Sequence, residues 1–106
     1  MCGQLVAQPG KREQFTEIML RAADIVSTLA GCNMYAVTHD QGDDVTLWIM
    51  EMWIDKEAHD ASLKDPRVRA LIQEALPLMD GEPDGACLTV IGGYGIRIRK
   101  GFIGLS

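Results

Sequence analysis

The sequence predicts a single α+β domain in which two helices cover one face of an antiparallel sheet. Hydrophobic spacing alternates between the strand period and the helix period in the order β-α-β-β-α-β. A polar, glycine-containing turn at residues 40–44 separates two strand-like segments, which predicts a hairpin. Together these observations indicate the ferredoxin-like arrangement, and 106 residues suffice for its one hydrophobic core.

The first half of the chain is expected to supply a strand, a helix and a second strand. Residues 3–8 read as a short strand that ends at a Pro-Gly pair. Apolar residues then recur three or four positions apart, which predicts one face of an amphipathic helix over residues 11–29. Gly31 is a suitable C-terminal stop, and residues 32–38 read as the second strand.

The second half repeats this pattern after the hairpin. The third strand is expected at residues 45–54, and Asp55 is a suitable N-cap for a short helix that follows it. Asp65-Pro66 restarts a longer helix, since proline is favoured at the first helical position. Residues 86–91 read as the fourth strand.

Residues 1–91 therefore form the predicted domain, and residues 92–106 form a C-terminal tail. The tail reads as a glycine-rich connection followed by an alternating segment, which we interpret as an extra strand or a dimer arm. Its cations are Arg97, Arg99 and Lys100, with no acid among the last ten residues. We expect this basic tail to lie against the acidic body of its own or a neighbouring subunit.

Both faces of the third strand are apolar, although the helices cover only one side of the sheet. A second copy of the chain is the simplest cover for the other side. Burying that face at about 25 cal/mol per Å² yields several kcal/mol per subunit before association costs. We therefore predict a homodimer joined through the sheet faces, with a space between the sheets that is partly polar at Glu51.

Composition limits the kinds of molecule that this protein is expected to bind. A net charge of −5 argues against nucleic acid or anionic membrane as the main partner. No apolar run approaches the ~20 residues that span a bilayer, and no secretion signal is visible. Three cysteines without C-x-x-C spacing fit a reduced cytoplasmic compartment, and neither they nor the two histidines have metal-ligand spacing.

Several short motifs carry a resemblance to a known family. In their order and spacing they resemble the antibiotic biosynthesis monooxygenase domain, over roughly residues 4–91. The resemblance implies dimeric α/β barrels in which two ferredoxin-like sheets face each other. It also implies oxidation of quinols or polyketide phenols by O2 without flavin, metal or haem, so no cofactor is expected. The motifs are Pro9-Gly10-Lys11, Gly31-Cys32 with Tyr35, Glu51-x-Trp53, and Glu57-Ala58 with Leu63 and Pro66.

The sequence departs from this family at two histidines. Quinol-oxidising relatives commonly carry a helix histidine where this chain has Ser62, and a second where it has Arg67. The histidine of this chain, His59, lies three residues before Ser62. The haem-degrading branch uses a strand-one asparagine, but strand one here offers only Gln4 and Gln8, which argues against haem degradation.

Three residues are the catalytic candidates. Trp53 either stacks on an aromatic substrate or fills the core. Glu51 is either a general base with a raised pKa or a structural partner of Arg21 or Arg69, because a carboxylate in an apolar strand is costly unless paired. His59 is either the base that takes a phenolic proton or a surface histidine on a solvated helix.

Four further residues are candidates for substrate binding. Simple alternation places Asn33 and Tyr35 on one face of the second strand, where Asn33 would orient a carbonyl or oxygen and Tyr35 would donate a hydrogen bond. Asn33 equally fits a role in satisfying the strand backbone. Met50 is expected to shape the pocket with Trp53 and Tyr35, and Ser62 occupies the position of the family histidine.

These observations predict a cofactor-independent monooxygenase that oxidises a small electron-rich aromatic. In this hypothesis a base deprotonates the substrate, the anion passes an electron to O2, and recombination gives the oxygenated product. Two alternatives stay open at this stage. One is a non-catalytic dimeric barrel that binds or senses a small apolar ligand, which Ser62 favours. The other is a structural dimer with a solidly packed interface.

Overall fold

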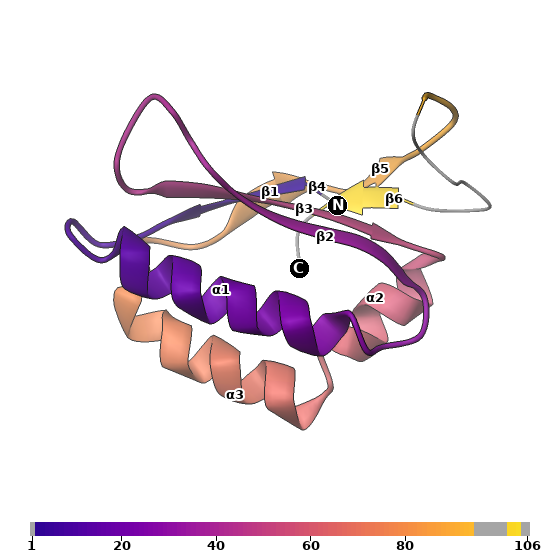
Figure 1. Ribbon diagram of the computed structural model, residues 1–106, viewed down its shortest axis with the longest axis horizontal. Helices are drawn as coiled ribbons and strands as arrows, with labels where there is room; N and C mark the ends of the chain where they lie inside the picture. The colour runs from indigo at the N-terminus through magenta and orange to yellow at the C-terminus, as the bar shows by residue number, and fades with distance from the viewer. Residues whose placement is uncertain (1, 95–101, 105–106) are drawn as a thin grey trace.

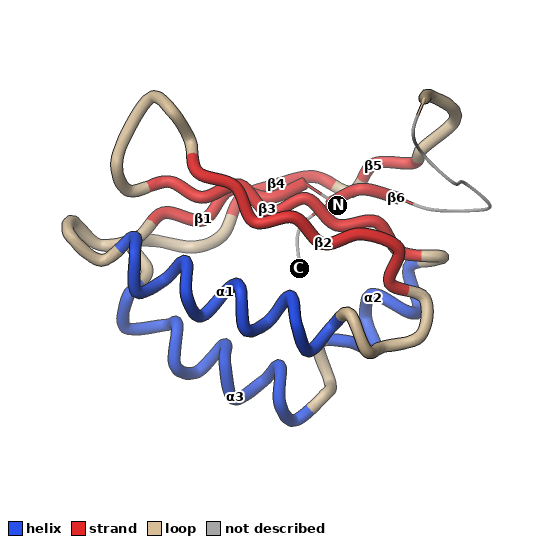
Figure 2. Tube along the Cα trace, viewed as in Figure 1, coloured by secondary structure: helices blue, strands red, loops and turns tan. Residues whose placement is uncertain are grey.

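A computed structural model of the chain describes residues 2–94 and 102–104. Three helices lie beneath one face of a single sheet, and the opposite face of the sheet is not covered by a described helix (Figure 1). Figure 2 shows the two layers in the same view. The helices are α1 (Arg12–Val26), α2 (Lys56–Ser62) and α3 (Pro66–Ala75), followed by the short 3-10 helix η1 (Leu76–Leu78). The strands are β1 (Cys2–Val6), β2 (Cys32–His39), β3 (Thr46–Trp53), β4 (Asp84–Ala86), β5 (Leu88–Thr89) and β6 (Phe102–Gly104).

The topology confirms the predicted ferredoxin-like fold. β3 lies between β2 and β1 and is antiparallel to both, while β4 pairs antiparallel with the other edge of β1. The β2–β3 hairpin has the predicted polar turn. The Asp43 carboxylate fixes that turn by accepting hydrogen bonds from two backbone N–H groups and from the Thr46 hydroxyl. These bonds hold the pKa of Asp43 below its usual range.

The predicted fourth strand at residues 86–91 is wrong in detail, because the chain forms two short strands there. β4 pairs with β1, and β5 then pairs with β6 beyond the start of β1. β6 continues the line of β1 along β3, because β1 pairs with β3 up to Met50 and β6 pairs with the next three residues of β3. The tail thus contributes a strand at Phe102–Gly104. The alternating segment that the sequence analysis reads as an extra strand, with Arg97, Arg99 and Lys100, lies outside the described residues.

Helix boundaries follow local chemistry. α1 ends at Val26, three residues before the predicted end. Ser27 and Thr28 there donate side-chain hydrogen bonds to backbone carbonyls of the last helical turn, which competes with helix continuation. The predicted caps of the other helices are confirmed, because Asp55 accepts a hydrogen bond from the Ala58 N–H and Asp65 accepts one from the Arg67 N–H.

The two faces of β3 have different environments. One face packs against the helices, and its side chains are completely buried; they are Leu47, Ile49, Glu51 and Trp53. The other face holds Trp48, which is partly buried, and Met50, which is 36% exposed, between Thr46 and Met52, which are buried. The core therefore lies between the sheet and the helices, and Glu51 belongs to the core layer.

Gly31 joins the end of α1 to β2 at a point of very close packing. Its φ of 88° lies in the left-handed region, and its carbonyl accepts a hydrogen bond from the Ile54 N–H at 2.7 Å. A Cβ atom at this position would lie 2.7 Å from side-chain carbons of both Ile54 and Ala58. Glycine therefore allows the α1–β2 connection to hold the start of α2 against the sheet.

We predict that Gly31→Ala destabilises the protein by about 1–3 kcal/mol, since it combines backbone strain with two steric overlaps. The measurement is the free energy of unfolding from urea denaturation. Gly81→Ala is the matched control, because Gly81 has a similar φ of 81° and a Cβ atom added there would have open space within 4 Å. Equal losses for the two variants would contradict the role given to close packing.

Candidate active site

Glu51 and Trp53 form a buried pair on the helix-facing side of β3. Both are 0% exposed, and the Trp53 Nε1–H donates a hydrogen bond to Glu51 Oε1 at 3.1 Å. The expectation that Glu51 faces a space between two sheets is wrong, because Glu51 lies on the face of β3 that packs against the helices. Of its expected partners, Arg21 instead binds Glu74 at 2.6 Å on the outer surface of α1 and α3.

His59 lies next to this pair. It is only 4% exposed, and its ring meets the Trp53 ring edge-on, with centroids 5.9 Å apart and an interplanar angle of 77°. The charged neighbours that suggest a solvated helix lie on the outer side of α2. The alternative of a surface histidine is therefore wrong, because the helix turns this residue inward.

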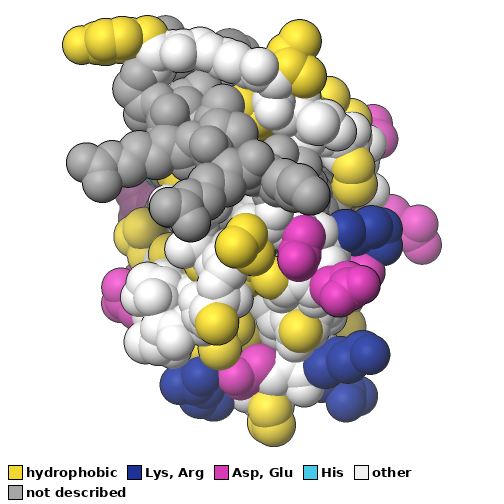
Figure 3. Space-filling model, turned by 90° about the vertical axis from the view of Figure 1, so that its right-hand side faces the viewer, with side chains coloured by type: hydrophobic (Ala, Val, Ile, Leu, Met, Phe, Trp, Pro, Cys, Tyr) yellow, Lys and Arg dark blue, Asp and Glu magenta, His cyan; other side chains and the backbone are white. Residues whose placement is uncertain are grey.

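Asp60 and Lys56 form the outer side of this cluster. Asp60 Oδ1 lies 3.1 Å from His59 Nδ1, and Asp60 Oδ2 accepts a hydrogen bond from Lys56 Nζ at 2.7 Å. Both contacts lower the pKa of Asp60, and the hydrogen bond from Lys56 has the larger effect. Figure 3 views the molecule from the end where α2 lies, and charged side chains of both signs surround scattered apolar ones there.

A β-bulge changes which residues of β2 face the helices. The register of β2 against β3 shifts between Cys32 and Met34, so strict alternation fails at Asn33. Tyr35 pairs with Glu51 across the two strands, and Cys32 pairs with Trp53. Both side chains pack against an apolar cluster of Val26, Trp53 and Val68, here called the Trp53 cluster. Asn33 is exposed, and its expected place beside Tyr35 is wrong.

Cys32 is the residue of this site that sequence reasoning does not select. Burial raises the pKa of its thiol, and the negative charge of Glu51 raises it further. The only sequence signal is its strand position next to Gly31, which gives no hint of a bulge. Met50, by contrast, lies on the open face of the sheet, so its expected grouping with Trp53 and Tyr35 is wrong.

A cavity of about 160 Å³ lies between the sheet and the helices, beside this cluster. Its walls are mainly apolar side chains of β1, α1 and α3, including Leu5, Phe15, Met19, Leu71 and Ala75. Among its lining residues, Tyr35 and Ser62 carry hydroxyl groups. Ser62, expected to take the place of a family histidine, is buried and donates a hydrogen bond to the His59 carbonyl at 2.6 Å.

The cavity and the buried cluster are neighbours with a shared wall. Tyr35, Val26 and Val68 line the cavity and also pack in the Trp53 cluster. Glu51, Trp53 and His59 are not among the residues that line the cavity. The structure therefore brings five predicted site residues into one region, with two of them, Tyr35 and Ser62, in direct contact with the open volume.

The described residues contain no group of three or more His, Cys, Asp or Glu side chains placed to hold a metal ion. Within the same part of the chain, each helix is too short or too polar to cross a bilayer.

Comparison with known proteins gives the family. The family model for antibiotic biosynthesis monooxygenases matches residues 3–74, which include the hairpin, α1, nearly all of β1 and the whole Glu51–Trp53–His59 cluster. The chain belongs to the antibiotic biosynthesis monooxygenase family. The expected family resemblance is thereby confirmed.

Solved structures agree with this membership. A protein from Chloroflexus aurantiacus, named provisionally as an antibiotic biosynthesis monooxygenase, shares 32% identity with a TM-score of 0.75, over 91% of this chain and 95% of its own. Provisionally named members from Caulobacter crescentus (23% identity, TM-score 0.74, 78% and 79% coverage) and Deinococcus radiodurans (21%, 0.72, 92% and 95%) show the same fold. None of the curated proteins compared with the chain matches it significantly.

We predict that the Cys32 thiol reports the charge on Glu51. In a Cys2→Ser, Cys87→Ser background, Glu51→Gln removes a negative charge, lowers the pKa of Cys32 and raises its reaction rate with a disulfide reagent at pH 8 several-fold. Glu74→Gln, which alters a carboxylate on the outer surface, is the control and leaves the rate unchanged. Equal rates in the parent and Glu51→Gln would show that Glu51 carries no charge near Cys32.

Proposed function

We propose that this protein is a cofactor-independent monooxygenase that oxidises a small hydroxylated aromatic with O2. The observation that carries the proposal is the apolar cavity with two hydroxyl groups, placed against the buried Glu51–Trp53–His59 cluster. Family membership supports oxidation as the class of reaction. The fold alone would not, because one fold hosts many activities.

The cavity suits the substrate of such a reaction. Its apolar walls bury an aromatic ring and exclude water. The Ser62 hydroxyl donates its proton to the His59 carbonyl, and its oxygen keeps lone pairs that accept a hydrogen bond from a phenolic hydroxyl, as does the oxygen of Tyr35. A phenol loses its proton to a base, and the resulting anion gives one electron to O2. The radical pair then joins through a ring carbon. Loss of water, with two hydrogens from the substrate, leaves one oxygen atom on the ring as a quinone carbonyl.

His59 and Glu51 are the proposed proton acceptors. Neither lines the cavity, so the proton would travel through an intervening hydroxyl or water, which general base catalysis permits. Tyr35 is the partner of Glu51 across the β2–β3 pair, and Ser62 is bonded to the His59 backbone. Each candidate base therefore has one cavity hydroxyl on a neighbouring residue. Trp53 holds both, by its hydrogen bond to Glu51 and its edge contact with His59.

One observation favours a second candidate function. Because the candidate bases lie behind the cavity wall, the same cavity also suits a protein that binds or senses a small apolar ligand without oxidising it. Ligand binding without oxygen uptake would distinguish this function from the monooxygenase.

We also propose a homodimer joined through the open sheet faces. Trp48 and Met50 lie on this face of β3, and the described helices leave the face uncovered (Figure 2). An apolar patch of this kind marks an interaction surface on a soluble protein. The cavity itself lies within one subunit, between its own sheet and helices.

We predict oxygen uptake when the protein is mixed with methylhydroquinone or menadiol without added cofactor. The product should gain one labelled atom from ¹⁸O2 for each O2 consumed. Removing the proton acceptor, by His59→Ala or Glu51→Gln, should lower kcat by about 10²–10⁴-fold. His39→Ala is the control, since His39 is exposed and bonds Thr16 on the surface. No uptake with any quinol would overturn the proposed oxidation, and full activity in both variants would overturn the proposed bases.

We predict that Met50→Lys converts the dimer to a monomer at micromolar concentration, because it places a charge in the middle of the proposed apolar interface. Sedimentation velocity measures the change. Leu20→Lys is the matched control, because Leu20 is 51% exposed on α1, on the helical side of the molecule. A monomeric parent protein would contradict the proposed assembly.

A further inference from the structure

Asp60 connects the buried His59 ring with the surface of α2. It follows His59 directly in the chain, and its carboxylate oxygen Oδ1 lies 3.1 Å from the Nδ1 atom of the ring. The His59 side chain is 5% exposed and that of Asp60 is 46% exposed, so this contact lies where the buried ring approaches solvent. The state of the Asp60 carboxylate therefore determines what the Nδ1 atom can do.

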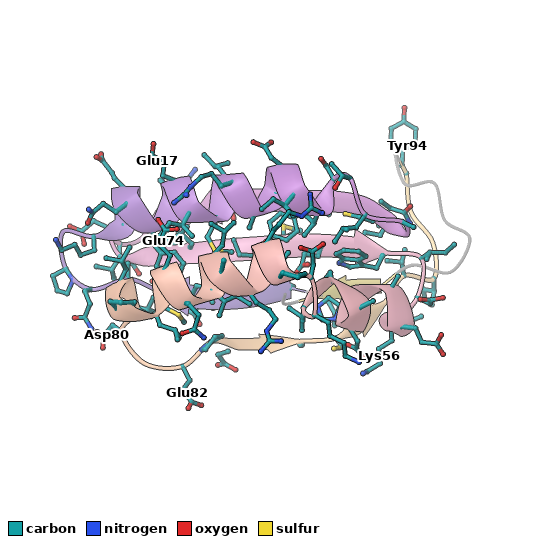
Figure 4. The ribbon with its side chains drawn as sticks, turned by 90° about the horizontal axis from the view of Figure 1, so that it is seen from below. Glu17, Lys56, Glu74, Asp80, Glu82 and Tyr94 are labelled. Atoms are coloured by element: carbon teal, nitrogen blue, oxygen red, sulfur yellow. The ribbon has the colours of Figure 1, made fainter. Side chains whose placement is uncertain are left out.

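Lys56 holds the charge of Asp60. It lies one helical turn earlier, at the i, i+4 spacing that places two side chains next to each other on a helix. Lys56 Nζ donates a hydrogen bond to Asp60 Oδ2 at 2.7 Å, and Figure 4 shows Lys56 at the margin of the helical layer. The bond raises the pKa of Lys56 and lowers the pKa of Asp60, so both groups are charged near neutral pH. An ionised carboxylate can only accept hydrogen bonds.

A partner that can only accept fixes the tautomer of His59. The ring nitrogen that faces the carboxylate must carry a proton, so Nδ1 is an N–H donor in both the neutral and the protonated ring. Any proton that the ring gains or loses is therefore gained or lost at Nε2, which is fully shielded from solvent. The edge contact with Trp53 limits rotation of the ring and keeps Nδ1 toward Asp60.

Resting on the proposed function, we infer that Asp60 is a positioning residue for His59. It holds one proton on Nδ1 and leaves Nε2 as the nitrogen that takes the proton of the phenolic substrate. In this step the phenol O–H bond breaks and an N–H bond forms at Nε2, through the intervening hydroxyl or water. The Asp60 carboxylate stabilises the positive imidazolium that results. The imidazolium then returns this proton to the reduced oxygen that leaves as water, which restores the neutral ring.

Asp60→Asn tests the tautomer, because Lys56 determines how the new amide is oriented. The Lys56 ammonium can only donate, so it takes the amide oxygen and leaves the amide NH2 group facing His59 Nδ1. Nδ1 must then accept, which moves the proton of the neutral ring to Nε2. We expect the Nδ1–H tautomer in the parent protein and the Nε2–H tautomer in Asp60→Asn.

The nitrogen and carbon NMR shifts of the His59 ring measure the tautomer at a pH where the ring is neutral. His39, the other histidine of the chain, is exposed, so a His39→Ala background leaves a single imidazole to observe. Glu57→Gln removes an exposed carboxylate from the same helix and is the matched control, which should keep the parent tautomer. An Nε2–H tautomer in the parent, or an unchanged tautomer in Asp60→Asn, would overturn the inference.

A double variant separates this effect from a general disturbance of α2. When Lys56→Met is added to Asp60→Asn, the amide oxygen loses its Lys56 partner and can turn to Nδ1. The double variant should therefore regain the Nδ1–H tautomer at least in part. Lys56→Met alone keeps the carboxylate at Nδ1 and should leave the tautomer unchanged. An Nε2–H tautomer that persists fully in the double variant would contradict the orientation given to the amide.

Oxygen uptake measures the catalytic consequence. Asp60→Asn should lower kcat with menadiol by about 10–100-fold, the range typical of a residue that orients a functional histidine. KM should not change, because Asp60 is not among the residues that line the cavity. In a His59→Ala background the same substitution should have no further effect, since it acts through the imidazole. An unchanged kcat in Asp60→Asn, or a further loss in the His59→Ala background, would exclude the positioning role.

The two readouts separate this inference from the proposed function. The expected change of tautomer, without oxygen uptake from any quinol in the parent, would overturn the oxidation and leave the tautomer assignment standing. Oxygen uptake in the parent, with an unchanged tautomer in Asp60→Asn, would overturn the present inference alone.

Discussion

The hydrogen bond between the Trp53 indole and the Glu51 carboxylate is the constraint on which the site depends. Burying a carboxylate between the sheet and the helices is costly unless polar groups replace the water that it loses, and the indole N–H supplies one such group. The bond fixes the indole, and the indole in turn provides the surface that His59 meets edge-on. A single strand therefore sets the position of a carboxylate, an aromatic ring and an imidazole in one dry region.

The fold is predictable because each element has a strong local signal. The aspartates that cap α2 and α3, the proline at the start of α3 and the polar hairpin turn are all readable from the sequence, and each forms as expected. The errors fall at the edge of the sheet. Strand pairing there depends on a distant segment, since β5 pairs with β6 rather than with β1, and no local pattern specifies such a partner.

The candidate site is predictable only in part. The sequence singles out Glu51, Trp53 and His59, but an apolar strand with two similar faces does not reveal which face meets the helices. The bulge in β2 exchanges Asn33 for Cys32, because one extra residue reverses the alternation of side chains. The cavity along α3 has no sequence signal, since its residues form an ordinary amphipathic face and the volume results from incomplete packing against the sheet.

The position of β6 has a practical consequence for handling this protein. Cys2 at the start of β1 is the neighbour of Gly104 in β6, so the two ends of the described chain meet within one sheet. Figure 1 shows the N-terminus beside β6. An added segment, such as an affinity tag, that continued the direction of β1 beyond its first residue would meet the residues of β3 that pair with β6. A tag ahead of β1 therefore needs a spacer that leads away from the sheet, or it will compete with β6 for the same residues of β3.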